Sequence, residues 1–146
     1  LEHAFDRGRS EPGRLHLMIL DLDHFKPVND RHGHLAGDRV LAGFAALVKA
    51  TLGPDCVAGR LGGEEFVVFS AQQSINEFRA LAERIRTGLE RAELPIDNGH
   101  VRITVSIGIA DQSMEMRAAA DLLRDADGAL YKAKLGGRNR IVDSDG

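Results

Sequence analysis

The chain has a single cysteine, Cys56, among its 146 residues. One cysteine excludes a disulfide framework within the chain and any zinc site built from several cysteines. Net charge is also small, since the formal charge is -3 at pH 7. A slightly acidic chain argues against binding to nucleic acid or to a membrane surface through overall charge. A phosphate-bearing ligand would therefore need a local basic cluster.

Long apolar runs are missing as well. No segment approaches the roughly 20 apolar residues that a membrane-spanning helix needs, and no signal peptide is visible. Together with the single cysteine, these absences predict a cytoplasmic domain that does not itself contact a membrane. Because the chain starts at Leu1 within a helical pattern, we expect it to be part of a longer protein. A membrane anchor, if that protein has one, would lie N-terminal to this domain.

Several common catalytic motifs are absent too. The sequence has no G-x-S-x-G element, no Ser-His-Asp arrangement and no G-x-x-x-x-G-K-[ST] phosphate loop. His32 and His34 lack the spacing of a helical metal pair, and no further histidine or cysteine completes a zinc set. These absences disfavour a serine hydrolase, a P-loop nucleotide hydrolase and a zinc enzyme.

The residues that are present predict one globular domain over residues 1–146, with an apolar content of 43%. The near-continuous apolar run at 15–22 is typical of a central strand buried on both faces, and the period of two at 100–110 predicts another long strand. The other expected elements are a helical segment at 1–9, a turn at 10–13, a short helix at 25–32, helices at 35–52, after Ser74 and at 117–134, a hairpin around 56–69 and an edge strand at 140–142. This order indicates an α/β (α+β) fold in which helices flank a central mixed five-stranded sheet.

The predicted hairpin carries two glycines followed by two acids at its tip. Gly62 and Gly63 supply the positive φ angles that a short turn requires, and Glu64 and Glu65 follow them directly. Taken alone, this segment is also consistent with an ordinary turn flanked by solvated glutamates.

Two further acids, Asp21 and Asp23, lie at the carboxyl end of the first predicted strand. If that strand lies beside the hairpin, at least one acid of each pair converges on one point. Converging carboxylates raise one another's pKa unless a cation is present, and carboxylate oxygens are ligands that Mg²⁺ accepts. Surface acids at strand ends are an equally good reading of the same residues.

Polar and basic clusters follow elsewhere in the chain. Asn29 and Asp38 could together match the donors and the acceptor of a guanine edge, although turn chemistry also favours Asn, Asp and Gly. Lys134 and Arg138 flank a Gly-Gly pair after the last helix and could face one anion, and Lys26 could join them. Nearby Lys132 is explained by the helix dipole alone.

Taken together, these motifs resemble the GGDEF domain of the diguanylate cyclase family, in a GGEEF form. The resemblance covers nearly the whole chain and follows the family order through segments 21–26, 29–30, 33–34, 37–38, 62–66, 106–108, 126–134 and 137–139. It implies a fold related to the palm of nucleotidyl cyclases and polymerases. It also implies that two GTP molecules condense to cyclic di-GMP with release of two pyrophosphates, across a homodimer of domains. An attached N-terminal sensory or dimerising domain is expected with it. The alternative is an inactive module that binds GTP or cyclic di-GMP and regulates an attached domain.

The resemblance also assigns roles to individual residues. Asp21 and Glu64, with the Leu22 carbonyl, would bind Mg²⁺ or Mn²⁺, with two ions per half-site. Glu65 would be a second-metal ligand or would help to deprotonate the 3'-hydroxyl, so that Asp21, Glu64 and Glu65 form the catalytic set. Asn29 and Asp38 would bind guanine. The phosphates would be held by Lys134 and Arg138, with backbone amides near Phe25 and Lys26.

The sequence departs from the family pattern in two places. Many members carry an inhibitory product site, Arg-x-x-Asp, five residues before the Gly-Gly turn, where this chain has Gly53 and Cys56 instead. We therefore expect no inhibitory product site here. The usual opening signature, Asp-x-Leu-Thr-Gly-Leu followed by Asn-Arg-Arg, is also missing, so we expect that the N-terminal part of the domain is not included.

Overall fold

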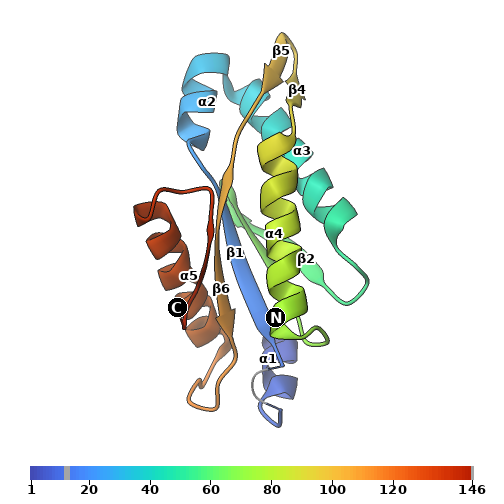
Figure 1. Ribbon diagram of the computed structural model, residues 1–146, viewed down its shortest axis with the longest axis vertical. Helices are drawn as coiled ribbons and strands as arrows, with labels where there is room; N and C mark the ends of the chain where they lie inside the picture. Colours follow the sequence, from blue (N-terminus) through green and yellow to red (C-terminus); the bar gives the residue numbers. More distant parts are fainter. Residues whose placement is uncertain (12–13, 146) are drawn as a thin grey trace.

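The computed structural model describes residues 1–11 and 14–145. Its main sheet has five strands in the order β2-β3-β1-β6-β7 (Figure 1). Neighbouring strands are antiparallel except for β6 and β7, which are parallel, so the sheet is mixed as predicted. The strands are β1 (His16–Leu22), β2 (Val57–Gly62), β3 (Glu65–Ser70), β6 (Val105–Asp111) and β7 (Ile141–Asp143).

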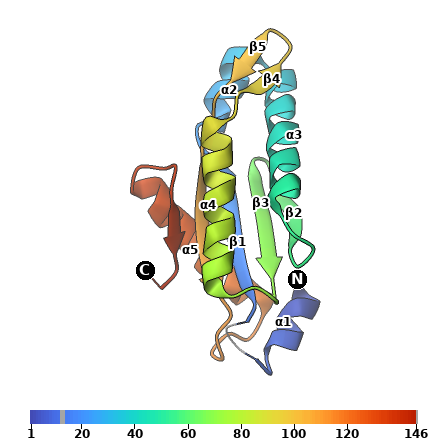
Figure 2. The ribbon, with the colours of Figure 1, turned by 45° about the vertical axis from the view of Figure 1, so that its right-hand side comes forward.

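Helices cover both faces of this sheet. Two long helices, α3 and α4, lie side by side on one face, while α5 crosses the other face with α1 near its lower end (Figures 1 and 2). The short helix α2 continues from the end of β1 and packs against α3. None of the helices in the described ranges is both long and apolar enough to cross a membrane. The helices are α1 (Glu2–Gly8), α2 (Phe25–His32), α3 (His34–Thr51), α4 (Ile75–Arg91) and α5 (Ala119–Leu135).

The apolar residues of β1 contribute side chains to two hydrophobic cores, one on each face of the sheet. Met18 and Leu20 face the core under α3 and α4, whereas Leu17 and Ile19 face the core under α5 and α1. All four side chains are buried, which confirms the prediction of a strand covered on both faces. The alternation continues to Asp21, which therefore lies on the α5 side of the sheet.

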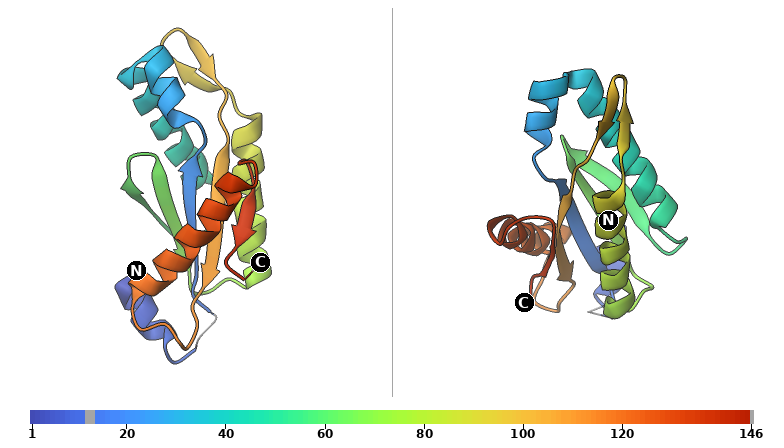
Figure 3. Two further views of the ribbon diagram at one scale, coloured as in Figure 1. Left: turned by 90° about the vertical axis from the view of Figure 1, so that its left-hand side faces the viewer. Right: turned by 45° about the horizontal axis from the view of Figure 1, so that its top comes forward.

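Helix α5 lies unusually close to β6 because of one glycine. A Cβ atom added at Gly108 would lie 2.2 Å from the Ala126 carbonyl oxygen and 2.3 Å from the Leu130 nitrogen. No side chain fits in that space, so glycine allows the helix to rest directly on the strand. This contact directs the C-terminal end of α5 towards the end of β1 (Figure 3, left).

The predicted long strand at 100–110 is divided in two. Residues Gly99–Val101 form β5, which pairs with β4 (Leu94–Ile96) in a separate two-stranded sheet, and the main sheet resumes at Val105. Val101 and Ile103 still join the core under α3 and α4, so the period of two reflects burial but not one continuous ladder. A turn at 97–98 joins β4 to β5.

The start of α4 lies where the sequence predicts a helix after Ser74. The Ser74 hydroxyl accepts a hydrogen bond from the Glu77 amide, and the Glu77 carboxylate accepts one from the Ser74 amide, which together form a capping box at the start of α4. Of the turn predicted at 10–13, residues 12 and 13 lie outside the described residues.

Candidate active site

The tip of the β2–β3 hairpin lies beside the end of β1. Glu65 is the register partner of Asp21 in the β1–β3 ladder, and the Leu22 amide donates to the Glu64 carbonyl at 3.4 Å. Asp21 and Glu65 thus sit opposite each other, with Glu64 at the tip next to them. The convergence of the two acid pairs, which the sequence left open, is present for Asp21, Glu64 and Glu65.

The hairpin turn itself differs in detail from the Gly-Gly turn of the sequence. Gly62 pairs with Glu65, so the two turn residues are Gly63 and Glu64, with φ at Gly62 and Gly63 of 150° and 50°. Leu61 is an extra residue of β2, a β-bulge that sequence reasoning did not predict. The Arg60 guanidinium closes the turn by donating to the Gly63 carbonyl at 2.9 and 2.6 Å. Glu64 is therefore carried by a turn with defined geometry.

Asp21 is a half-buried acid, and one of its carboxylate oxygens accepts no hydrogen bond. Burial raises the pKa of its carboxyl to about 6 against the opposing charge of Lys134, and the nearby Glu64 and Glu65 carboxylates contribute to the rise. Its Oδ1 atom is buried without a hydrogen-bond partner, and the Lys134 ammonium lies 3.5 Å away. This oxygen therefore has an ion-pair partner in Lys134 but accepts no hydrogen bond.

This donor set fits a hard divalent cation. Burial raises the pKa of Glu65 as well, and Asp127 and Glu64 add to the effect. The ionised forms of Asp21 and Glu65, whose pKa values are both raised, are stabilised when a cation binds beside them. Within the described residues, no group of three or more His, Cys, Asp and Glu side chains is arranged to hold a metal ion. Mg²⁺ typically takes only one or two protein carboxylates and completes its shell with water and phosphate.

Asp23 does not join this cluster. Its side chain is 1% exposed and accepts hydrogen bonds from the Thr104 hydroxyl at 2.7 Å and the Ser106 hydroxyl at 2.6 Å. Burial acts to raise the pKa of Asp23, but hydrogen bonds from Ser106, Thr104 and Lys134 outweigh burial and hold that pKa below its usual value. The sequence grouped Asp23 with the other acids, whereas the structure gives it a separate buried network.

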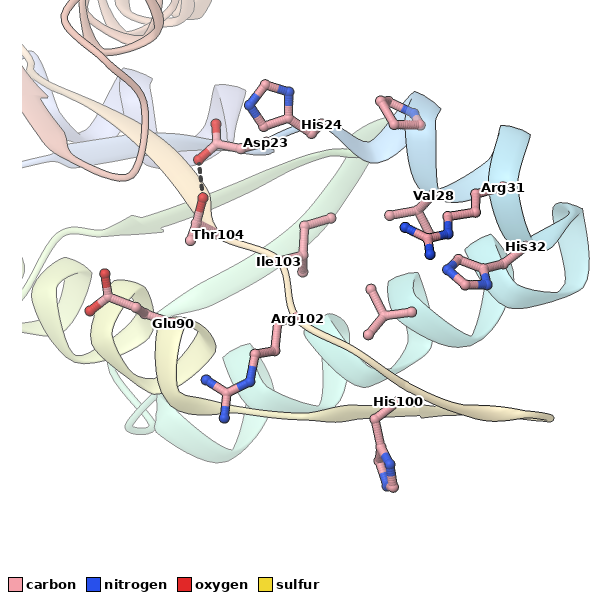
Figure 4. Close-up of a pocket in the computed structure, with 12 residues that line it drawn as sticks. Asp23, His24, Val28, Arg31, His32, Glu90, His100, Arg102, Ile103 and Thr104 are labelled. Atoms are coloured by element: carbon pink, nitrogen blue, oxygen red, sulfur yellow. Dashed lines mark hydrogen bonds between the residues drawn. The ribbon is translucent and has the colours of Figure 1, made fainter.

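A cavity of about 590 Å³ adjoins Asp23 on the side of the β4–β5 hairpin (Figure 4). Val28 and Arg31 reach into it from α2, and Ile103 faces them from the opposite wall. The acids of the hairpin tip do not line it. Asp23 and its partner Thr104 therefore stand at the edge of this cavity, while Lys134 contacts the same carboxylate.

The basic residues are only partly brought together. Lys134 reaches the acids, with its ammonium 2.9 Å from Asp23 Oδ1 and 3.5 Å from Asp21 Oδ1. Arg138 lies on the loop that follows α5. Lys26 instead pairs with Asp30 at 3.1 Å, and both side chains are exposed. The Lys26 side chain is thus not among the groups that contact the acids, and its phosphate role stays a prediction. The amides of Phe25 and Lys26 lie in the first turn of α2, where helix amides are free to bind an anion.

The candidate guanine-binding residues lie on the adjoining helices α2 and α3. A Cβ atom at Gly37 would lie 1.7 Å from the Asn29 Oδ1 atom and 3.2 Å from the Phe25 ring, so Gly37 permits α2 to contact α3 here. Asp38, the next residue of α3, is exposed, and Asn29 is half-buried. Asn29 is thus held next to the helix that carries Asp38, as the predicted pair requires.

A family model described as "Diguanylate cyclase, GGDEF domain" matches residues 1–140. Diguanylate cyclase A of Treponema denticola is 38% identical over 144 residues, which cover 97% of this chain and 39% of that protein. The chain spans well under half the length of the curated relatives that it matches, from 39% down to 21%.

Solved structures agree with this match. The GGDEF domain of DgcB from Caulobacter crescentus, in complex with c-di-GMP, has a TM-score of 0.91 and 32% identity, covering 100% of this chain and 86% of that chain. The active GGEEF domain of a diguanylate cyclase from Vibrio cholerae has a TM-score of 0.87 and 34% identity, covering 98% and 90% of the two chains. The resemblance drawn from the motifs is confirmed, and the chain belongs to the GGDEF family of diguanylate cyclase domains.

Proposed function

We propose that this domain is a diguanylate cyclase that condenses two GTP molecules into cyclic di-GMP. The observation that carries this proposal is the pairing of Asp21 with Glu65, which brings the acids of the hairpin tip to the end of β1 beside Lys134. Carboxylates that can bind a metal ion and an ammonium group that can bind phosphate, both at one strand end, suit a metal-bound triphosphate. A domain that uses GTP would work in the cytoplasm.

Asp21, Glu64 and the Leu22 carbonyl would hold Mg²⁺ or Mn²⁺, with two ions per half-site. The bound cations would neutralise charge on the α-phosphate and on the leaving pyrophosphate. The unpartnered Oδ1 of Asp21 supports this assignment. Glu65, opposite Asp21, either completes the second cation site or accepts the proton of the 3'-hydroxyl.

The remaining residues would orient the nucleotide. Asn29 and Asp38 would read the guanine edge, Lys134 and Arg138 would hold the phosphates, and the first amides of α2 would add donors. These groups position one nucleotide but supply no second 3'-hydroxyl.

The reaction therefore requires a second copy of the domain. The 3'-oxygen of each GTP forms a bond to the α-phosphorus of the opposing GTP, and the bond from that phosphorus to the bridging oxygen breaks. Two pyrophosphates leave, and each hydroxyl proton passes to a base. We propose that a region N-terminal to this domain brings the two copies together in the longer protein.

The direct test is incubation of the purified domain with GTP and Mg²⁺, followed by separation of the nucleotides. Cyclic di-GMP and pyrophosphate should form in a 1:2 ratio, and the rate per domain should rise with protein concentration or with a fused dimeric coiled coil. GTP binding without product, even in the coiled-coil fusion, would favour the inactive regulatory module instead.

Product inhibition should be weak because the usual inhibitory residues are replaced. Gly53 and Cys56 stand at those positions, in the segment between α3 and β2. Without a guanidinium and a carboxylate there, cyclic di-GMP lacks its charge-assisted contacts. We expect initial rates to stay unchanged at low-micromolar cyclic di-GMP, and a noncompetitive block at that concentration would contradict this. The variant G53R/C56D provides a positive control, since a Cβ at Gly53 would meet no atom within 4 Å.

A further inference from the structure

Asp23 is the most completely bonded acid at the end of β1. Besides the hydrogen bonds from the Thr104 and Ser106 hydroxyls, its carboxylate accepts one from the Lys134 ammonium at 2.9 Å and one from the Asn139 backbone amide at 3.0 Å. Each oxygen accepts two hydrogen bonds, Oδ1 from Ser106 and Lys134, and Oδ2 from Thr104 and Asn139. One carboxylate thus connects β6 to the last turn of α5 and to the loop after it.

The loop that Asp23 holds has an unfavourable backbone conformation. Arg138 and Asn139 have φ angles of 65° and 47°, so two consecutive residues with side chains adopt the left-handed region. Such residues cost free energy and persist only where surrounding contacts impose them, which is common at functional sites. The Arg138 amide also donates to the Ala133 carbonyl at 3.0 Å, so this loop closes back on α5.

A second anchor holds the same loop from α4. The Asn139 side chain donates to Glu90 Oε2 at 2.5 Å and accepts from Arg86 Nη1 at 2.9 Å. Arg86 also pairs with Glu83 at 2.5 Å, which fixes the guanidinium on the helix. Asn139 is therefore bound through its backbone by Asp23 and through its side chain by α4.

These contacts converge on the two residues proposed to bind phosphate. Lys134 donates a hydrogen bond to Asp23 directly. Arg138 precedes Asn139, whose backbone amide donates to the same carboxylate. Because Asp23 already has four donors, it has no free lone pair for a metal ion in this arrangement. Its contacts indicate a role that acts through its neighbours.

We propose that Asp23 is a positioning residue that fixes Lys134 and the Arg138 loop in the geometry that receives the triphosphate. The proposal rests on the proposed function, since it assumes that these two residues bind the phosphates of GTP. A merely structural Asp23 would contribute to folding but would not distinguish a triphosphate from a monophosphate.

The test compares two ligands by calorimetry, GMP and the α,β-methylene analogue of GTP, which cannot be turned over. Asp23→Asn should weaken binding of the triphosphate analogue about tenfold or more, the effect of misplacing a charge-assisted hydrogen bond. Binding of GMP should change less than about twofold. In a Lys134→Met background, Asp23→Asn should weaken binding of the analogue by much less than in the wild type, because the effects of substitutions at coupled residues are not additive.

Two further variants keep the test decisive. Asp111→Asn removes a carboxylate that pairs with His16 at 2.7 Å at the other end of β1, and it should leave both affinities unchanged. Asn139→Ala releases the loop from α4 without altering Asp23, and it should also lower affinity for the analogue selectively. If Asp23→Asn fails to fold, Ser106→Ala, which removes one hydrogen bond to the same carboxylate, should weaken analogue binding selectively in its place.

Equal losses for the analogue and GMP, or full additivity with Lys134→Met, would overturn the positioning role. A wild-type protein that binds the analogue no better than GMP would instead refute the phosphate assignment of the proposed function. The two failures are therefore distinguishable.

Discussion

Replacement of Glu64 by alanine is expected to abolish cyclic di-GMP formation, with a loss of about a thousandfold or more in turnover. The Glu64 side chain stands at the tip of the hairpin, close enough to Asp21 to raise the pKa of that carboxyl. Removing it leaves Asp21 as the only carboxylate assigned to the first cation. Charge on the α-phosphate would then be poorly neutralised in the transition state.

The fold should survive this change. The contact from Glu64 to β1 runs through its carbonyl oxygen, which accepts from the Leu22 amide and is retained in alanine. The turn is closed by Arg60 on the Gly63 carbonyl, which is also unaffected. The free energy of unfolding, measured by thermal denaturation, should therefore change by no more than the roughly 0.5 kcal/mol typical of a surface substitution.

The matched control is Glu115→Ala, an exposed glutamate in the connection between β6 and α5. It removes one negative charge from the domain at a site away from the hairpin tip, and turnover should stay within about twofold of wild type. Turnover that survives Glu64→Ala in a folded dimer would show that the cation is held by other groups. Loss in both variants would point to net charge or dimerisation.

Much of the fold follows from local sequence patterns. The run in β1 is apolar at nearly every position, and the structure buries it on both faces. The capping box of α4 and the glycines of the hairpin are equally local signals. The division of 100–110 could not be predicted, because Val101 and Ile103 keep the alternation of a strand while packing outside the main sheet.

The site was predictable to a lesser degree. The convergence of Asp21 with the hairpin tip needs only two neighbouring strands, which the pattern of acids at strand ends suggests. The separate role of Asp23 depends on Thr104 and Asn139, which are 81 and 116 residues away along the chain. No local pattern encodes these contacts. The left-handed conformation at Arg138 and Asn139 is hidden for the same reason, since neither residue is a glycine.

Asp21→Asn is expected to remove activity and, in the absence of metal, to stabilise the fold at pH 8. Burial and the neighbouring acids raise the pKa of Asp21 from 3.8 to about 6, so ionising this carboxyl in the folded state is unfavourable. A rise of about two pKa units corresponds to about 3 kcal/mol at most, and a gain on the order of 1 to 3 kcal/mol is expected. Asparagine keeps the shape but carries no charge to desolvate.

The sign of the pH dependence makes this prediction specific. Between pH 3.8 and about 6 the folded protein binds more protons at Asp21 than the unfolded chain, so this contribution to stability is lost as pH rises through about 6. In denaturant unfolding without metal, the Asp21→Asn variant should therefore have a higher free energy of unfolding than the wild type at pH 8. This difference should close at pH 4. Added Mg²⁺ should stabilise only the wild type at pH 8, because binding to the folded state raises its unfolding free energy. A variant less stable than wild type at pH 8, or a stability difference that persists at pH 4, would show that ionised Asp21 does not destabilise the metal-free fold.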